Sequence, residues 1–309
     1  MKVHHSLADI GAIKNPVLTI GTFDGVHVGH QTIIKMLKEQ AAKCDGETVL
    51  FTFHPHPRMV LYPESHGVEL LQTQEEKLAK LERYGVDHVI LYPFSKDFSR
   101  LTATEFVRDI LVNQIGVKQV VIGYDHQFGK NREGNIDFLR ELSLVYDFAV
   151  TEIGAQEINE VNVSSTKIRR AIAEGDIATA NAYLGEPFPI EGVIVKGNGF
   201  GRGFGFPTAN IDIQDDTKLV PADGVYHVKI FHKEEQYTAL LSIGTNPTID
   251  RNNKRTIEAY ILDFDQAIYG EKIRLEVIEF LRPQITFDSI DGLIEKMKQD
   301  ELEIRARLV

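Results

Sequence analysis

The chain has 309 residues, of which 43% are hydrophobic and 26% are charged, and its formal net charge is −11. This composition is typical of a folded protein with one large or two ordinary domains, and the acidic balance argues against a general nucleic-acid-binding surface. The single cysteine, Cys44, excludes an internal disulfide. We expect neither a signal peptide nor a membrane-spanning segment, because no long apolar run is present, so the prediction is a cytoplasmic protein with no membrane and no nucleic-acid partner.

Strand-like and helix-like patterns alternate in the first half of the chain. Apolar runs predict strands at 17–20, 48–53, 88–92, 119–122 and 148–153, with helices between them. Thr73 with Glu76, and Thr102 with Glu105, form the capping-box pattern that opens a helix, and 135–146 is another helical pattern. The alternation predicts an α/β domain with a mostly parallel sheet.

The first predicted strand runs into the stretch GTFDGVHVGH at 21–30, and an amphipathic helix follows. Backbone N–H groups and the helix dipole at such a junction favour an anion such as phosphate. His27 and His30 share one face of the helix start, and imidazole donates hydrogen bonds to phosphate oxygens. Gly29 leaves room for a nucleotide near the backbone. The alternative interpretation is a pair of ordinary surface histidines.

The stretch resembles the HxGH signature of nucleotidylyltransferases. Its longer form, G-x-F-D-G-x-H-x-G-H, resembles the bacterial FAD synthetase family, whose members are usually bifunctional riboflavin kinase/FMN adenylyltransferases. The resemblance implies a Rossmann-like nucleotidylyltransferase domain in which His27 and His30 are catalytic. It also implies that the ATP-binding residues here are Gly21, Phe23, Asp24 and Gly29.

Two more loops follow predicted strands, where α/β proteins place their chemistry. Residues 53–57 are similar to the Phe-x-Pro-His-Pro stretch beside the family's flavin site. The two histidines there could suggest a metal, but no Cys or carboxylate spacing completes a ligand set, so a rigid pocket wall is the favoured interpretation. Residues 123–134 are similar to its G-x-D-x-x-F-G-x-x-R-x-G segment, with His126 where the family often has Phe. The resemblance implies a catalytic Asp125 with Arg132 as its charge partner, and a flavin site formed by Phe53, His56, Pro57, Phe128 and Asn162.

Three hydroxyls and three cations crowd the helix start at 164–170, a combination suited to a triphosphate. A plain capped helix is the alternative interpretation. The segment resembles the I-S-S-T/S-x-I-R signature of the superfamily, which implies that Ser164, Ser165 and Thr166 bind ATP and that Arg169 is catalytic. The three elements together predict attack of a phosphate on the α-phosphorus of ATP, with Mg²⁺ sharing the charge.

Prolines after Gly185 mark a boundary, so we predict domains at 1–185 and 186–309. Beyond it, short β-type runs at 190–196, 225–231, 237–243, 256–262 and 273–280 predict a small antiparallel barrel. A final helix is predicted at 289–307, with Asp288 as its cap.

Residues 197–205 include five glycines, in a loop whose backbone can approach phosphates, and the loop has no Walker motif. The stretch 197–210 resembles the riboflavin kinase motif G-x-x-x-G-R-x-x-G-F-P-T-A-N, with Phe204 where the family usually has Leu. The resemblance implies that Thr208 and Asn210 hold Mg²⁺ and the nucleotide phosphates. It implies that Glu258 is the general base for the riboflavin 5′-hydroxyl. The remaining residues it assigns to nucleotide or flavin are Gly199, Arg202, Gly205, Pro207, Tyr226 and Arg282.

The sequence therefore predicts a two-domain enzyme of FAD biosynthesis. Its C-terminal domain phosphorylates riboflavin to FMN, and its N-terminal domain transfers the adenylyl group of ATP to FMN, giving FAD and pyrophosphate. The expected partners are these small molecules, and the expected state is a monomer or weak homo-oligomer. Three alternatives stay open: an adenylyltransferase whose barrel only binds flavin or regulates, a class I aminoacyl-tRNA synthetase, and a flavin sensor or regulatory RNA-binding protein without catalysis.

Overall fold

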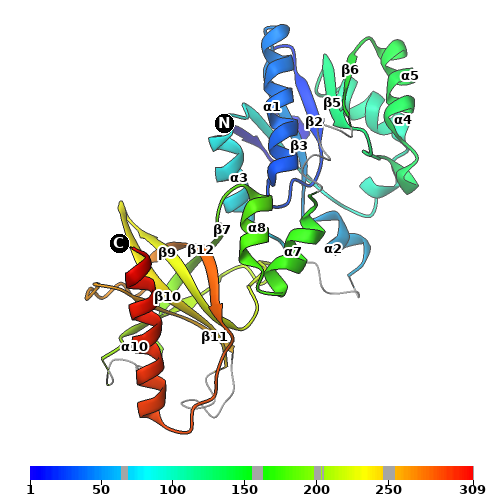
Figure 1. Cartoon of the computed structure of the whole chain (residues 1–309). Coiled ribbons are helices and arrows are strands. Elements are labelled where there is room, and N and C mark those ends of the chain that lie inside the picture. Colours follow the sequence, from blue (N-terminus) through cyan, green and yellow to red (C-terminus); the bar gives the residue numbers. More distant parts are fainter. Residues whose placement is uncertain (64–68, 155–162, 198–202, 204, 246–254, 309) are drawn as a thin grey trace. The chain divides into compact units, whose positions relative to one another are not determined.

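A computed structural model describes residues 1–63, 69–154, 163–197, 203, 205–245 and 255–308. The chain forms two compact units (Figure 1). The first contains Met1–Val68 and Lys77–Ser164, and the second contains Glu69–Glu76 and Ser165–Val309.

The first unit is built on a parallel sheet with the strand order β1-β4-β3-β2-β5-β6. Its strands are β1 (Lys2–His4), β2 (Val17–Ile20), β3 (Thr48–His54), β4 (His88–Pro93), β5 (Gln119–Gly123) and β6 (Ala149–Ile153). The five predicted strands are confirmed. The sequence analysis missed β1, whose three residues are too few to show a pattern. Val17, Leu18 and Leu50 are fully buried, as continuous apolar strands of a sheet covered on both faces should be.

The longer helices of this unit follow the patterns in the sequence. The helical segments are η1 (Leu7–Asp9), α1 (Val28–Lys43), α2 (Pro57–Leu61), α3 (Gln74–Arg83), η2 (Phe98–Arg100), α4 (Ala103–Glu105), the π-helical η3 (Phe106–Val112), η4 (Lys130–Arg132) and α5 (Ile136–Tyr146). Both capping boxes are confirmed: at α4, Thr102 and Glu105 each accept the other's backbone N–H, and Thr73 and Glu76 do the same at α3. Helix α3 begins in the second unit and from Lys77 onward belongs to the first.

Helix α1 carries the amphipathic pattern predicted for it. Ile34, Leu37 and Ala41 are buried, and the helix packs on β2, β3 and β5 (Figure 1). Cys44 caps its C-terminal end and packs beside Ala41 in the core. The cysteine therefore has the structural position expected of it.

The second unit contains a closed antiparallel barrel with the strand order β10-β11-β8-β7-β12-β9. Its strands are β7 (Phe188–Val195), β8 (Thr208–Asp212), β9 (Gly224–His232), β10 (Glu235–Thr245), β11 (Arg255–Ile261) and β12 (Lys272–Arg282). The predicted barrel and its five strands are confirmed. Strand β8 was missed because polar Thr208, Asn210 and Asp212 alternate in it with only two nonpolar residues.

In the described part of this unit, the barrel is accompanied by the helices α7 (Ser165–Ala173), α8 (Ile177–Leu184) and α10 (Ile290–Arg307). Ile304 of α10 packs with Val225, Leu240 and Leu262 of the barrel. The predicted cap at Asp288 is wrong, because the side chain of Ser289 accepts the N–H of Gly292 at 3.2 Å. A serine hydroxyl one residue later completes the same capping geometry.

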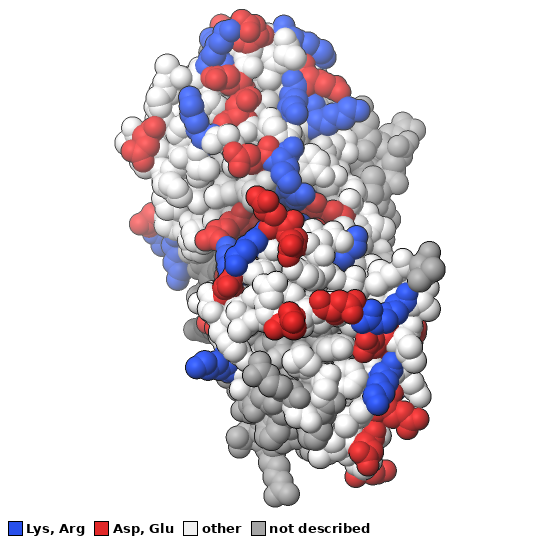
Figure 2. Space-filling view, turned by 90° about the vertical axis from the view of Figure 1, so that its left-hand side faces the viewer, with Lys and Arg blue, Asp and Glu red and all other residues white. Residues whose placement is uncertain are grey.

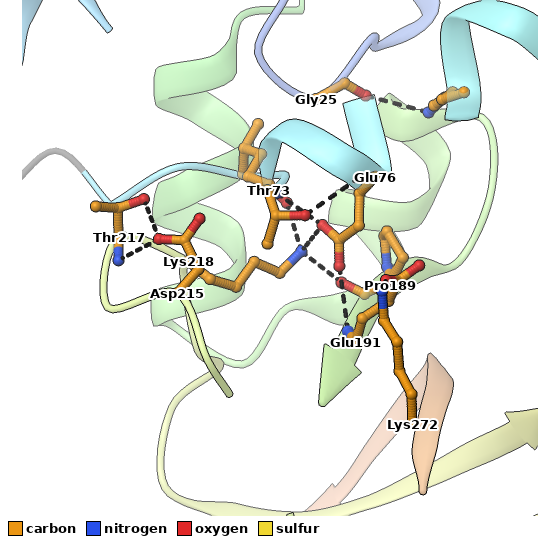
Figure 3. A network of polar contacts seen from close by, with 11 residues as sticks. Gly25, Thr73, Glu76, Pro189, Glu191, Asp215, Thr217, Lys218 and Lys272 are labelled. Atoms are coloured by element: carbon orange, nitrogen blue, oxygen red, sulfur yellow. Dashed lines mark hydrogen bonds and ion pairs between the residues drawn. The ribbon is translucent and has the colours of Figure 1, made fainter. Parts of the chain in front are cut away.

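A buried ion pair explains why residues 69–76 belong to the second unit (Figure 3). Lys218 Nζ lies 2.6 Å from Glu76 Oε2, and it also donates to the carbonyls of Leu71 at 2.8 Å and Pro189 at 2.6 Å. Both ion-pair side chains are almost fully buried. Helix α8 also packs on the barrel, since Asn181 donates to the carbonyl of Val277 on β12. Helix α7 packs against α8, so both helices belong to the second unit. The functional boundary at 185/186 stays a prediction.

Candidate active sites

The first candidate site is the turn between β2 and α1, which carries six of the predicted residues. Gly21 follows the last residue of β2, and His27 is the N-cap of α1. The Nδ1 atom of His27 accepts the N–H of His30 at 3.3 Å, and the two rings stack with centroids 3.7 Å apart. A Cβ at Gly29 would lie 3.3 Å from the His27 ring, so glycine there makes room for the stack.

The rest of the turn is buried and has an unusual backbone. Phe23 is 1% exposed and packs against the His30 ring, and Asp24 is 4% exposed. Phe23, Gly25 and Val26 all have positive φ values, of 49°, 86° and 39°. Phenylalanine and valine are rare in that region, where strain persists only when the surrounding structure holds the residues in place. Such strain is typical of functional turns.

The two histidines of this turn are held neutral. Burial lowers the pKa of His27 to about 4, with a smaller contribution from the charge of Lys80. Burial also lowers the pKa of His30, and His27, Lys80 and Lys77 act in the same direction. Since His27 Nδ1 accepts a hydrogen bond, a neutral His27 has its proton on Nε2, which leaves one N–H able to donate to a phosphate oxygen.

Two of the residues predicted to bind flavin, Phe53 and Phe128, contact one apolar cluster of the same unit. Phe53 on β3 packs edge-on to Phe94 at 5.4 Å, and Phe128 packs against Phe106 at 6.0 Å. Phe128 belongs to the buried core cluster that includes Phe51 and Ile122, and the partly buried Phe53 packs against it. A flat isoalloxazine ring suits such aromatic walls.

The other predicted residues of these two loops differ in their surroundings. His56 caps α2 by accepting the N–H of Arg58 at 3.2 Å, and Pro57 is the first residue of that helix. Asp125 is exposed, and the adjacent His126 has a pKa lowered by burial to about 4. Asn162 lies outside the described residues.

The predicted triphosphate segment divides between the two units. Ser164 ends the first unit, and Ser165, Thr166 and Arg169 begin α7 in the second. Within the second unit, Arg169 Nε donates to the carbonyl of Glu69 at 2.7 Å. The role of these residues toward ATP stays a prediction.

The second candidate site lies where β8 and β11 pair in the barrel. Glu258 is the register partner of Asn210, and Thr208 pairs with Tyr260. Thr208 Oγ1 donates to Glu258 Oε2 at 3.1 Å. The structure therefore brings together the three residues predicted for metal binding and base catalysis.

Thr256 is a member of this group that the sequence analysis did not select. Its hydroxyl donates to Glu258 Oε1 at 3.1 Å, so each carboxylate oxygen of Glu258 accepts a hydroxyl. The signal was available, because residues 256 and 258 share one face of a strand. Gly197 lies two residues beyond the end of β7, and a Cβ there would lie 2.0 Å from Asn210 Nδ2, so the Asn210 amide rests against bare backbone.

The oxygen donors at this point fit a magnesium ion. Mg²⁺ prefers hydroxyl, amide and carboxylate oxygens and commonly takes one or two protein ligands plus substrate phosphates. Thr208 and Asn210 supply a hydroxyl and an amide oxygen, and the Glu258 carboxylate lies next to Thr208. No cluster of three or more His, Cys, Asp or Glu side chains suited to a metal occurs in the described part of the chain.

Other residues assigned to the kinase loop have structural contacts. The Tyr226 hydroxyl donates to the carbonyl of Ala222 at 2.6 Å, and burial raises its pKa to about 12. Arg282 binds Asp300 of α10 with N–O distances down to 2.6 Å. Gly205 has φ of 83°, and Pro207 directly precedes β8. Gly199 and Arg202 lie outside the described residues.

Comparison with known proteins identifies both halves of the chain. The model of a family described as FAD synthetase matches residues 10–167, and that of riboflavin kinase matches residues 184–308. A protein of Listeria monocytogenes named bifunctional riboflavin kinase/FMN adenylyltransferase is 39% identical over 98% of this chain and 96% of its own length. The chain belongs to this family.

A second named relative and one solved structure are also similar to nearly the whole chain. A protein of Escherichia coli with the same name is 35% identical over 94% of this chain and 91% of its own length. A crystal structure titled macrolide-efflux protein from Streptococcus pneumoniae is 33% identical, covers 98% of each chain and superposes with a TM-score of 0.87. Among the residues that the structure describes, none of the helices is both long and apolar enough to cross a bilayer.

Proposed function

We propose that the barrel phosphorylates riboflavin to FMN and that the parallel-sheet domain converts FMN and ATP to FAD and pyrophosphate. The two family models match this one chain in reverse order of the reactions, since the FAD synthetase match ends at residue 167 and the riboflavin kinase match begins at residue 184. The observation that carries the proposal is that each unit holds its own set of groups: Glu258 is bonded to Thr208 and Thr256 in the barrel, and His27 stacks on His30 in the sheet domain. Each set of groups suits one of the two reactions.

In the kinase reaction, the riboflavin 5′-oxygen bonds to the γ-phosphorus of ATP, and ADP leaves. Glu258 accepts the proton that the 5′-hydroxyl loses in this step. The two threonine hydroxyls orient the carboxylate, each from a different strand. Thr208 and Asn210 would hold Mg²⁺, which would supply positive charge to neutralise the phosphates. The barrel therefore supplies one general base, Glu258, and the two hydroxyls that orient its carboxylate.

In the adenylyl transfer, a phosphate oxygen of FMN bonds to the α-phosphorus of ATP and pyrophosphate leaves. The attacking oxygen is already an anion, so no protein base is needed. Neutral imidazole N–H groups of His27 and His30 donate to the phosphate oxygens, and the N-terminus of α1 adds backbone donors. Ser164, Ser165, Thr166 and Arg169 remain the predicted contacts of the β- and γ-phosphates.

We place the boundary between the activities at 185/186. Helix α8 ends at Leu184, and Gly185 has a φ of 72°, a left-handed conformation that favours glycine and stops the helix. We further propose a cytoplasmic protein that is a monomer or weak homo-oligomer.

The test is a time course of the purified chain with riboflavin, ATP and Mg²⁺, with the flavins separated by chromatography. We expect FMN first and FAD later. If the chain forms FAD from added FMN but forms no FMN from riboflavin, the barrel is a flavin-binding or regulatory module and not a kinase. Absence of turnover with either flavin would overturn the enzymatic proposal and favour a sensor, whereas amino-acid-dependent exchange of pyrophosphate into ATP would favour an aminoacyl-tRNA synthetase.

A further inference from the structure

Helix α3 turns two lysines toward the interior of the sheet domain. Lys77 is 8% exposed and Lys80 is 1% exposed, and their i,i+3 spacing puts them on one face of the helix. On the face shown in Figure 2, by contrast, exposed basic side chains are mixed with acidic ones. Lysine is almost never fully buried unless a nearby group makes use of its charge or its donors. The surroundings of these two ammonium groups therefore indicate their function.

Both ammonium groups reach the turn that precedes the HxGH helix. Lys80 Nζ donates to the carbonyl of Gly25 at 3.1 Å (Figure 3). Lys77 Nζ lies 3.5 Å from the carbonyl of Thr22 and 3.5 Å from Thr52 Oγ1. The lysines thus hold both ends of the Thr22–Gly25 segment, within which Phe23 adopts its strained conformation.

The charges of the two lysines act on the same histidine pair. Lys80 lowers the pKa of both His27 and His30, and Lys77 adds to the effect on His30, with burial the larger cause in each case. Asp24 is the acidic group of the turn, and it opposes the burial that lowers the pKa of Lys77 to about 8. A protonated His27 would present an N–H to the N–H of His30 and lose the hydrogen bond that caps α1.

We propose that Lys77 and Lys80 are positioning residues of the adenylyl-transfer site, which hold the carbonyls of the Thr22–Gly25 turn and so fix the His27–His30 pair for contact with phosphate. The inference rests on the proposed adenylyltransferase function. The lysines act through the turn and the histidines, and they do not touch substrate. Their charge has a second effect, since it disfavours an imidazolium at either histidine.

The experiment compares Lys80→Met, Lys77→Met and Lys77→Gln in the full chain, with FMN, ATP and Mg²⁺ over a range of pH. We expect kcat for FAD formation to fall about 10- to 100-fold, as for a small misplacement of catalytic groups, with little change in KM. The acid limb of the pH profile should move to higher pH in each variant, since a repelling charge beside the histidines is gone. A purely structural role would leave that limb unmoved.

Lys38→Met is the matched control. Lys38 is an exposed lysine on α1 that also donates to a backbone carbonyl, that of Tyr84 at 3.0 Å, away from the turn. We expect it to keep wild-type kcat and pH profile. Urea unfolding of each variant, followed by circular dichroism, reports whether the sheet domain is folded, and riboflavin phosphorylation in the same samples reports the barrel.

Three outcomes separate the possibilities. If the unsubstituted chain forms no FAD from FMN, the proposed function fails and the lysine assignment with it. If it forms FAD but the variants keep its kcat and acid limb, the lysine assignment alone is overturned. If the methionine variants do not fold, the Lys77→Gln variant is used instead, because its amide keeps a hydrogen-bond donor near Thr22 and Thr52 while the charge is removed. An acid limb that does not move in Lys77→Gln also overturns the assignment.

Discussion

The two candidate sites differ in the groups that they hold ready. The sheet domain presents two neutral imidazoles at a helix N-terminus, whereas the barrel presents a carboxylate whose two oxygens accept threonine hydroxyls. The difference follows from the nucleophiles, because a phosphate attacks as an anion and an alcohol must first lose a proton. The riboflavin kinase reaction therefore needs a general base, whereas the adenylyl transfer needs only hydrogen-bond donors to the phosphates.

The units also bury lysine in different ways. Lys218 makes short contacts of 2.6 to 2.8 Å with a carboxylate and two carbonyls, and its ring contact with Phe188 is 4.5 Å from the centroid. Lys77 has contacts of 3.5 Å. Short, complete bonding is typical of a structural group, so we expect loss of Lys218 to act on folding and loss of Lys77 to act on catalysis.

Replacing the proposed base should have the largest effect. In Glu258→Gln we expect riboflavin phosphorylation to fall about 10²- to 10⁴-fold, the usual contribution of a general base, while FAD formation from FMN is kept. Both rates are measured by flavin chromatography. Glu235→Gln, at an exposed glutamate of β10, is the control and should keep both. Full kinase activity in Glu258→Gln would contradict the assignment of a general base to the barrel site.

Breaking the buried ion pair should lower stability rather than a single rate. Lys218→Met leaves Glu76 buried without its cation, which costs about 3–5 kcal/mol of unfolding free energy. Lys272→Met is the matched control, because that lysine binds Glu75 and Glu191 at the surface and is worth less than about 1 kcal/mol. Urea titrations give both values. Equal losses in the two variants would contradict the structural role of Lys218.

Removing one imidazole should separate the two activities in the opposite direction. In His30→Ala we expect FAD formation to fall about 10²- to 10³-fold, as for loss of one preorganised donor, with FMN formation unchanged. The exposed His5 offers the control His5→Ala. Loss of both activities in a folded His30→Ala protein would argue against two separate sites.

Acid should weaken the sheet domain more than the barrel. Among the described residues, His27, His30, His88 and His126 of the sheet domain have pKa values lowered by burial, and His227 is the barrel histidine in this group. The unfolded chain binds these protons first, so stability is complete above pH 6.5 and falls toward pH 4. For His27, with a folded-state pKa of about 4, the loss at pH 5 is about 2 kcal/mol.

The measurement is the activity that survives incubation at pH 5 with mild denaturant, assayed at pH 7. We expect FAD formation to be lost before FMN formation. Simultaneous loss, or earlier loss of the kinase, would show that the buried histidines do not set the acid stability of the sheet domain.

The sequence determined a large part of the fold, because its signals are local. The α/β alternation, the capping boxes and the short β runs predicted the parallel sheet and the barrel, both of which the structure confirms. Motif spacing also placed His27 beside His30, since residues three apart at a helix start face the same way. Strand β8 was not visible, because its polar side chains give no hydrophobic signal and the pairing with β11 defines it.

Only the tertiary structure decided which distant residues meet. Thr208 meets Glu258 only because β8 pairs with β11, which brings together two residues that are 50 positions apart in the chain. Lys77 and Lys80 look like surface lysines in a charged helix until packing buries them under the β2–α1 turn. Burial and its effect on pKa depend on contacts between residues far apart in the chain, and periodicity along the sequence carries no record of them.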